Sequence, residues 1–184
     1  MNIPNFITLG RIFLVPVVFW LLVSRRLETA FFVFLVAGAS DAVDGFLAKR
    51  YGWQTELGAY MDPLADKLLL VTVFVAFGFL GELPSWLVIA VVSRDVLIVM
   101  AFLFAWVVGH PLAVRPYRIS KVNTGAQIAL AALVLADGAF GLGWSTFRVV
   151  MVWITAALTL GSLAAYLQAW VRHMAQFEQR QPSE

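Results

Sequence analysis

The sequence predicts an all-α protein that crosses a membrane six times. Three observations support this fold class: 61% of the residues are hydrophobic, only 13% are charged, and the apolar residues fall into six long runs. Most of these runs reach the roughly 20 residues that a helix needs to cross about 30 Å of hydrocarbon. Because lipid offers the backbone no hydrogen-bond partners, helices are the expected structure for such runs.

Short segments rich in glycine, proline and basic residues separate the runs. In chain order, the runs cover residues 6–24, 29–49, 57–80, 84–108, 119–137 and 146–171. The first run lacks a basic leader and a small-residue cleavage site, so we expect a retained helix rather than a signal peptide. We predict one transmembrane domain, residues 1–175, followed by a polar tail, residues 176–184.

The distribution of basic residues predicts the orientation, because Lys and Arg in short loops are retained on the cytoplasmic side. Six spans place both termini on the same side. If that side is the cytoplasm, it receives Lys49, Arg50, Arg115, Arg118, Lys121, Arg172 and Arg180, whereas the outer side receives Arg25, Arg26 and Arg148. We therefore expect an integral protein of a bacterial inner membrane with both termini in the cytoplasm.

Charge and cysteine content exclude several classes of function. The net charge of +2 and the pI near 9.2 are modest, and cytoplasmic loops facing anionic headgroups explain them better than nucleic-acid binding does. The chain has no cysteine, which excludes disulfides, thiolate metal sites and cysteine nucleophiles.

Four aspartates lie close together in the second and third apolar segments. Asp41 and Asp44 are three residues apart, and Asp62 and Asp66 are four apart, so on helices each pair projects from one face. A charge inside a membrane helix costs about 2.5 kcal/mol or more. Four converging carboxylates would repel one another strongly unless cations lay between them.

These aspartates suit a hard divalent cation. Carboxylate oxygens favour Mg²⁺ or Mn²⁺, and the absence of cysteine, with His110 and His173 as the only histidines, argues against zinc. Two such cations about 4 Å apart can clamp the attacking and leaving oxygens of a phosphoryl transfer. Gly45 and Gly58 lie beside the carboxylates, where they either admit a bulky anionic group or allow close helix packing.

The spacing of these residues resembles the signature of the CDP-alcohol phosphotransferases. That signature is D-x-x-D-G-x-x-A-R, a spacer of about eight residues, and then G-x-x-x-D-x-x-x-D. This chain reads DAVDGFLAK over residues 41–49, then eight residues, then GAYMDPLAD over residues 58–66. The one departure is Lys49, which keeps the charge of the family's arginine but lacks its planar fork, and Arg50 is a candidate to compensate.

The resemblance implies transfer of a phosphatidyl group from a CDP-linked lipid to an alcohol, with release of CMP. It implies that Asp41, Asp44 and Asp62 bind two divalent cations, while Asp66 contributes to the second cation and acts as the general base on the acceptor hydroxyl. The implied nucleotide site consists of small, polar and basic residues: Thr8, Arg11, Asp44, Gly45, Ala48, Lys49 and Gly58. It also implies a homodimer, because family members pair.

Further charged residues are candidates for binding a phosphate on the acceptor. Arg94 and Asp95 interrupt the fourth run, where neither residue is expected to face lipid. Arg94 either binds the acceptor phosphate or forms a structural ion pair with a neighbouring helix. Arg115, Arg118 and Lys121 precede the fifth run, and they either donate to a phosphate or anchor the chain on the cytoplasmic side.

Two segments indicate which acceptor to expect. Within the family, Ser93–Val96 and Ile119–Thr124, followed by Gln127, resemble the cardiolipin synthases of the eukaryotic type, whereas Asp62–Lys67 is shared with phosphatidylglycerophosphate synthases. We therefore expect CDP-diacylglycerol as the donor and phosphatidylglycerol as the acceptor, giving cardiolipin. Glycerol-3-phosphate is the close alternative, because both acceptors carry a free hydroxyl and a phosphate.

A small transporter of cations or protons is an alternative from another functional class. A conduction pathway would distribute its charges through the depth of the membrane. Here all four acids lie between Asp41 and Asp66, at one expected level. That clustering favours an enzyme.

Overall fold

The computed structural model describes the backbone of residues 3–51, 56–107 and 118–178, and the side chains of residues 10–40, 67–100, 118–168 and 170. Over these residues the chain forms six α-helices and no strand, which confirms the all-α prediction. The helices are α1 (Ile3–Val23), α2 (Leu27–Tyr51), α3 (Glu56–Leu80), α4 (Ser85–Val107), α5 (Arg118–Phe140) and α6 (Ser145–Glu178). They match the six predicted runs, except that α6 continues into the first residues of the predicted tail.

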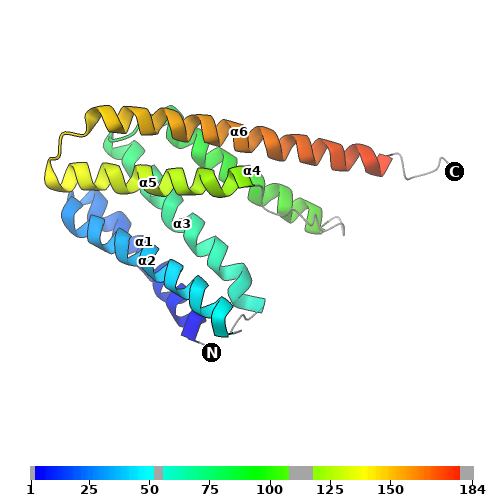
Figure 1. The fold of residues 1–184 in the computed structure, drawn as a ribbon, viewed down its shortest axis with the longest axis horizontal. Helices are drawn as coiled ribbons and strands as arrows, with labels where there is room; N and C mark the ends of the chain where they lie inside the picture. The colour runs from blue at the N-terminus through cyan, green and yellow to red at the C-terminus, as the bar shows by residue number, and fades with distance from the viewer. Residues whose placement is uncertain (1–2, 52–55, 108–117, 179–184) are drawn as a thin grey trace.

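The three connections α1–α2, α3–α4 and α5–α6 gather at one end of the bundle, on the left in Figure 1. Helix α1 packs against α2 and α3, α5 packs against α6 and α2, and α4 packs against α3 and α6. Because the helices alternate in direction, the end of α2 and the start of α3 lie at the end opposite the three connections (Figure 1). This topology separates the segments that carry the four aspartates from the three connections.

An apolar core fills the part of the bundle near the connections. Its fully buried members include Val18, Leu22, Phe74, Phe77 and Leu87, which come from α1, α3 and α4. Glycine permits close helix contact here. A Cβ atom on Gly78 of α3 would lie 3.1 Å from a methyl group of Val88 on α4.

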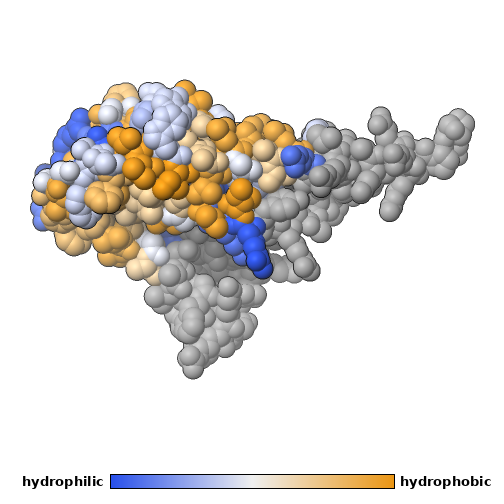
Figure 2. Space-filling model, turned by 45° about the horizontal axis from the view of Figure 1, so that its top comes forward, coloured by the Kyte–Doolittle hydropathy of each residue, from blue (hydrophilic) through white to orange (hydrophobic). Residues whose placement is uncertain are grey.

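Two helices, among the residues searched, are long and apolar enough to cross a membrane: α5 and the Ser145–Gln168 part of α6. Apolar stretches of 10–17 residues also occur in α1, α2 and α3. Large apolar side chains are exposed, among them Phe79 at 82% and Phe13 at 68%. Figure 2 shows apolar surface across the middle of the described face and hydrophilic surface at the end with the connections. This surface suits contact with lipid, and the six-span topology stays a prediction.

The first two connections use the same helix-ending motif. At the end of α1, Arg26 N donates to Leu21 O at 2.9 Å and Arg25 N donates to Leu22 O at 2.9 Å. At the end of α3, Gly81 occupies the position that Arg25 occupies after α1. Both residues have a positive φ, 57° for Arg25 and 75° for Gly81. Glycine is the usual residue in this conformation, so we expect the side chain of Arg25 to make a contact that offsets the backbone cost.

Candidate active site

The four aspartates lie on two helices that follow one another in the chain. Asp41 and Asp44 belong to the second half of α2, and Asp62 and Asp66 to the first half of α3. The helical backbone predicted around both pairs of aspartates is therefore confirmed. Their side chains lie outside the described residues, as do those of the predicted nucleotide-site residues Thr8, Gly45, Ala48, Lys49 and Gly58. The convergence of these side chains stays a prediction.

Arg11, the remaining residue of the predicted nucleotide site, has a described side chain. It lies on α1 and is only 2% exposed. A guanidinium in such a position is rarely tolerated in an apolar bundle without a specific role. Its burial on the helix that packs against both α2 and α3 is compatible with the predicted place near the aspartates.

A charged cluster lies inside the bundle, centred on Arg94 of α4. The Nη1 atom of Arg94 donates to Asp95 Oδ1 at 2.5 Å. Its Nη2 atom donates to Ser120 Oγ on α5 at 2.6 Å and to Ser162 Oγ on α6 at 2.5 Å. The guanidinium carbon also lies 5.8 Å from the centre of the Tyr166 ring, within range of a cation–π contact. Arg94 therefore links three helices.

Lys67 connects this Arg94 cluster to the aspartate motif. Lys67 immediately follows Asp66 on α3, and its Nζ atom lies 3.6 Å from Asp95 Oδ1. Asp95 is 5% exposed and Arg94 1% exposed. The prediction that neither side chain faces lipid is confirmed. Through Asp95 and Lys67, the cluster constrains the part of α3 that directly follows the proposed catalytic aspartate.

A line of buried polar side chains extends from the Arg94 cluster between α5 and α6. This α5–α6 seam consists of Asn123 and Gln127 on α5 and Thr155 and Thr159 on α6, each exposed by 1% or less. Thr159 Oγ1 donates to Asn123 Oδ1 at 3.0 Å. Among the described residues, Asn123 Nδ2, Gln127 Nε2 and Thr155 Oγ1 have no hydrogen-bond partner. Buried donors of this kind often bind ordered water or a ligand group.

The structure describes the side chains of three of the four predicted acceptor-site residues, Arg94, Arg118 and Lys121. Arg94 is buried, forms its ion pair with Asp95 on its own helix, and donates hydrogen bonds to serine hydroxyls of α5 and α6. The ion pair with a neighbouring helix is made by Asp95, with Lys67 of α3. A role of Arg94 in binding the acceptor stays a prediction. Arg118 and Lys121 are exposed on the first turn of α5, with no hydrogen bond or ion pair to any described side chain. Arg115 lies outside the described residues.

The sequence analysis did not identify Ser162 and Tyr166 as partners of Arg94, or Thr155 and Thr159 as members of the α5–α6 seam. Their spacing could have predicted a polar face, because Thr155, Thr159 and Ser162 recur every three or four residues and so share one face of α6. Ser120, Asn123 and Gln127 repeat in the same way on α5. Polar stripes at helical spacing within apolar runs favour a buried interhelical contact.

The donor set of the aspartate motif fits a divalent cation. Four carboxylates at helical spacing provide oxygen ligands alone, which hard cations prefer. Among the side chains that the structure describes, no three His, Asp or Glu residues come together as an alternative site. The aspartate motif is therefore a candidate metal site, and the position of its carboxylates stays a prediction.

Comparisons with known proteins agree with the motif. A family model described as CDP-alcohol phosphatidyltransferase matches residues 1–161. The chain is 34% identical to a chloroplastic CDP-diacylglycerol–glycerol-3-phosphate 3-phosphatidyltransferase of Oryza sativa and 32% identical to human cardiolipin synthase (CMP-forming), with 90% of the chain aligned to each. It spans 56% and 60% of the lengths of these two relatives. The CDP-diacylglycerol–glycerol-3-phosphate 3-phosphatidyltransferase of Escherichia coli K12 is 34% identical, over 91% of this chain and 94% of that protein.

Proposed function

The chain belongs to the CDP-alcohol phosphatidyltransferase family, and on this premise we propose that it transfers a phosphatidyl group from CDP-diacylglycerol to an alcohol in phospholipid synthesis. The observation that carries the proposal is the aspartate motif on α2 and α3, within the region that the family model matches. A transporter function would not explain why the four aspartates have this spacing. Release of CMP distinguishes the two functions directly.

In the proposed reaction, the acceptor hydroxyl attacks the phosphorus that carries the diacylglycerol moiety. The bond from that phosphorus to CMP breaks, CMP leaves, and the hydroxyl proton passes to the carboxylate of Asp66. A carboxylate can act as this base when it lies within hydrogen-bond reach of the hydroxyl. The Arg94 cluster, through Lys67, would hold the helix segment that carries Asp66 in position.

Asp41, Asp44, Asp62 and Asp66 would hold two divalent cations, Mg²⁺ or Mn²⁺. When bound, these cations would supply neutralising charge to the pyrophosphate and the developing negative charge of the leaving group. Gly45 and Gly58 would let the nucleotide approach the backbone, and Lys49 would oppose the charge of the pyrophosphate. Thr8, Arg11 and Ala48 complete the proposed nucleotide site.

For the acceptor, we propose phosphatidylglycerol, which makes the product cardiolipin. Support comes from the two segments that resemble cardiolipin synthases. Arg94 and Asp95 of the first segment, and Asn123 of the second with the Gln127 that follows it, are the buried polar residues among the described side chains of α4 and α5. Ser120 of the second segment is partly buried and accepts a hydrogen bond from Arg94. Arg115, Arg118 and Lys121 are proposed to bind the acceptor phosphate near the start of α5. Glycerol-3-phosphate is the second candidate, favoured by the match along nearly the full length of the Escherichia coli relative.

The two acceptors can be distinguished with purified protein. The protein is given CDP-diacylglycerol and Mg²⁺ or Mn²⁺, and each acceptor is supplied in turn. We expect CMP release and a cardiolipin product, identified by mass spectrometry, with phosphatidylglycerol. Turnover with glycerol-3-phosphate alone would exclude the cardiolipin assignment while leaving the transferase chemistry intact.

The substitution Asp66→Asn tests the proposed base. We expect CMP release to fall about 10² to 10⁴-fold, because a positioned general base contributes a factor of this size. The matched control is Asp137→Asn, the same chemical change at the opposite end of the bundle, where Asp137 Oδ1 only accepts a hydrogen bond from Trp144 N at 2.9 Å. Normal turnover of the Asp66→Asn variant would exclude this residue as the base.

We further propose that the chain is an integral protein of a bacterial inner membrane, that the aspartate motif faces the cytoplasm, and that the protein is a homodimer. The exposed apolar side chains and the two apolar helices support membrane insertion. Labelling of single cysteines introduced at residues 25 and 180 in intact cells tests the orientation. Residue 25 should react from outside and residue 180 only after permeabilisation.

A further inference from the structure

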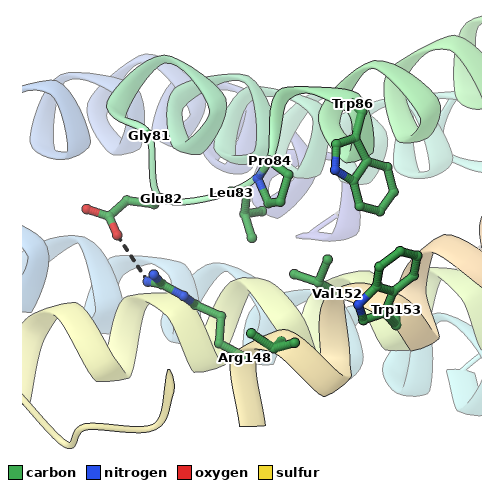
Figure 3. Close-up of a pocket in the computed structure, with 9 residues that line it drawn as sticks. Gly81, Glu82, Leu83, Pro84, Trp86, Arg148, Val152 and Trp153 are labelled. Carbon is green, nitrogen blue, oxygen red and sulfur yellow. Dashed lines mark hydrogen bonds and ion pairs between the residues drawn. The ribbon is translucent and has the colours of Figure 1, made fainter. Parts of the chain in front are cut away.

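A groove of about 440 Å³ lies at the end of the bundle opposite the aspartate motif. It runs between the α3–α4 connection and the first turns of α6 (Figure 3). Glu82 and Arg148 form one end, Leu83, Pro84 and Val152 line the middle, and Trp86 and Trp153 lie at the other end. The groove thus has one charged end and one aromatic end.

The charged end carries a surplus of positive charge. Glu82 accepts a hydrogen bond from Arg148 Nη1 at 3.2 Å and from Arg25 Nη1 at 2.9 Å. Two guanidinium groups therefore share one carboxylate, which leaves a net charge of +1 on this Glu82 cluster (+2 from the arginines and −1 from Glu82). Arg148 uses only one of its five N–H donors in a described contact, so several remain for an anion.

The other end of the groove suits an apolar chain. The rings of Trp86 and Trp153 lie 5.5 Å apart at an angle of 37°, and the two side chains remain 47% and 64% exposed. Leu83 and Val152 form a buried apolar floor. Exposed tryptophans beside an arginine at the end of an apolar helix bundle are typical of the membrane interface, where one side contacts acyl chains and the other contacts headgroups.

We propose that this groove binds one anionic phospholipid of the leaflet opposite the active site. Its headgroup phosphate accepts hydrogen bonds from Arg148, and the start of its acyl region lies on Leu83 and Val152 between the two tryptophans. The net positive charge of the Glu82 cluster complements a lipid of net charge −1, whereas a zwitterionic lipid gains no net attraction. A free anion would leave the apolar floor and the tryptophans uncovered, which is why the occupant is a lipid.

Tryptophan quenching by brominated lipids tests the proposal on the full chain in nanodiscs of phosphatidylcholine. Brominated phosphatidylserine or brominated phosphatidylcholine is added at matched fractions, and the difference between the wild type and Trp153→Phe isolates the Trp153 signal. Both probes are phosphodiesters, and neither is a substrate of the proposed reaction. We expect about fivefold tighter apparent binding of the anionic probe, the effect of one basic residue near a membrane surface.

Two variants and one control decide the role of the groove. Arg148→Gln should remove the preference for the anionic probe. Arg26→Gln should preserve it, because Arg26 lies at the same end but stacks on Trp20, 5.6 Å from its ring centre. Val149→Phe should reduce quenching by both probes by filling the groove. This variant leaves the Arg148–Glu82 ion pair in place, so the test survives if Arg148→Gln does not fold.

Four outcomes would overturn the proposal. Equal quenching by the two probes would contradict the proposed contact between Arg148 and the lipid headgroup. A preference that is unchanged in Arg148→Gln would contradict it as well. Loss of the preference when excess inorganic phosphate is added would indicate a site for a free anion. Protection of Trp153 from both probes, together with cross-links between copies through this face, would indicate a contact between subunits. Because none of these readouts depends on CMP release, failure here would leave the proposed transferase function untouched.

Discussion

The Arg94 cluster and the Glu82 cluster join several helices with the same kind of chemistry, but in different surroundings. In the Arg94 cluster, the side chains of Arg94 and Asp95 are 2% and 7% exposed. In the Glu82 cluster, the corresponding values are 56% for Arg25, 24% for Glu82 and 33% for Arg148. One cluster therefore lies in the interior, and the other is open to solvent or headgroups.

This difference in burial decides what each cluster does for the fold. A buried charge loses its hydration, so each of its partners must be present, and removing one leaves an uncompensated charge. An exposed ion pair is weakened by solvent and salt and contributes about 0 to 1 kcal/mol. We therefore assign the Arg94 cluster to holding the helices around the proposed active site, and the Glu82 cluster to shaping the groove at the other end.

Replacing Arg94 should have the largest effect on stability. Arg94→Met leaves Asp95 with only Lys67, and leaves Ser120 and Ser162 without their donor, so we expect a loss of about 3 to 5 kcal/mol. Thermal unfolding in detergent, followed by circular dichroism, measures this loss. Arg118→Met, the same change at an exposed position, is the control and should shift stability little.

The double variant Arg94→Met with Asp95→Leu sharpens the comparison. It removes both buried charges, so it should be more stable than Arg94→Met alone, even though it carries one more substitution. If the double variant were less stable than the single variant, the cost would come from lost packing and from Lys67 losing its partner Asp95, and not from an uncompensated charge on Asp95.

A smaller effect is expected in the α5–α6 seam, where bonded and unbonded hydroxyls occur on the same helix. Thr159→Val removes the donor to Asn123 Oδ1, and we expect it to cost about 1 kcal/mol. Thr155→Val removes a hydroxyl with no described partner and nearly preserves side-chain volume, so it should be neutral or slightly stabilising. The same unfolding measurement compares the two. Equal losses would indicate that Thr155 binds an ordered water.

The sequence predicts the helices well because their signals are local. Apolar runs, interrupted by segments such as Gly81–Pro84, specify where α3 ends and α4 begins within a few residues. The aspartate motif is equally local, since its spacing can be read along two consecutive helices. The burial of Arg94 and Asp95 is also predictable, because charges within an apolar run rarely face lipid.

Partners across the bundle could not be predicted in this way. Arg94 and Ser162 are 68 residues apart, and their contact depends on how α4 packs against α6. The spacing of Ser162 shows which face of α6 is polar, but not which helix that face meets. Glu82 is a similar case, because its two arginine partners come from the α1–α2 connection and from the first turn of α6, and they meet it only when the three connections gather at one end.

Replacing Arg25 should have the smallest effect on stability. Arg25 belongs to the exposed Glu82 cluster and also has an unfavourable backbone conformation. Arg25 has φ 57°, a conformation that costs a non-glycine residue about 1 kcal/mol or somewhat more. Its side chain donates to Glu82 at 2.9 Å, an exposed contact that contributes about 0.2 to 1 kcal/mol. Arg25→Gly loses the ion pair but relieves the backbone, so its stability should stay close to that of the wild type. Arg25→Ala loses the ion pair without that relief and should be less stable than Arg25→Gly in matched thermal unfolding. The reverse order would mean that the positive φ of Arg25 costs little here. A large loss of stability in both variants would mean that the Arg25–Glu82 contact is worth far more than its exposure implies, and the contrast between the two clusters would then disappear.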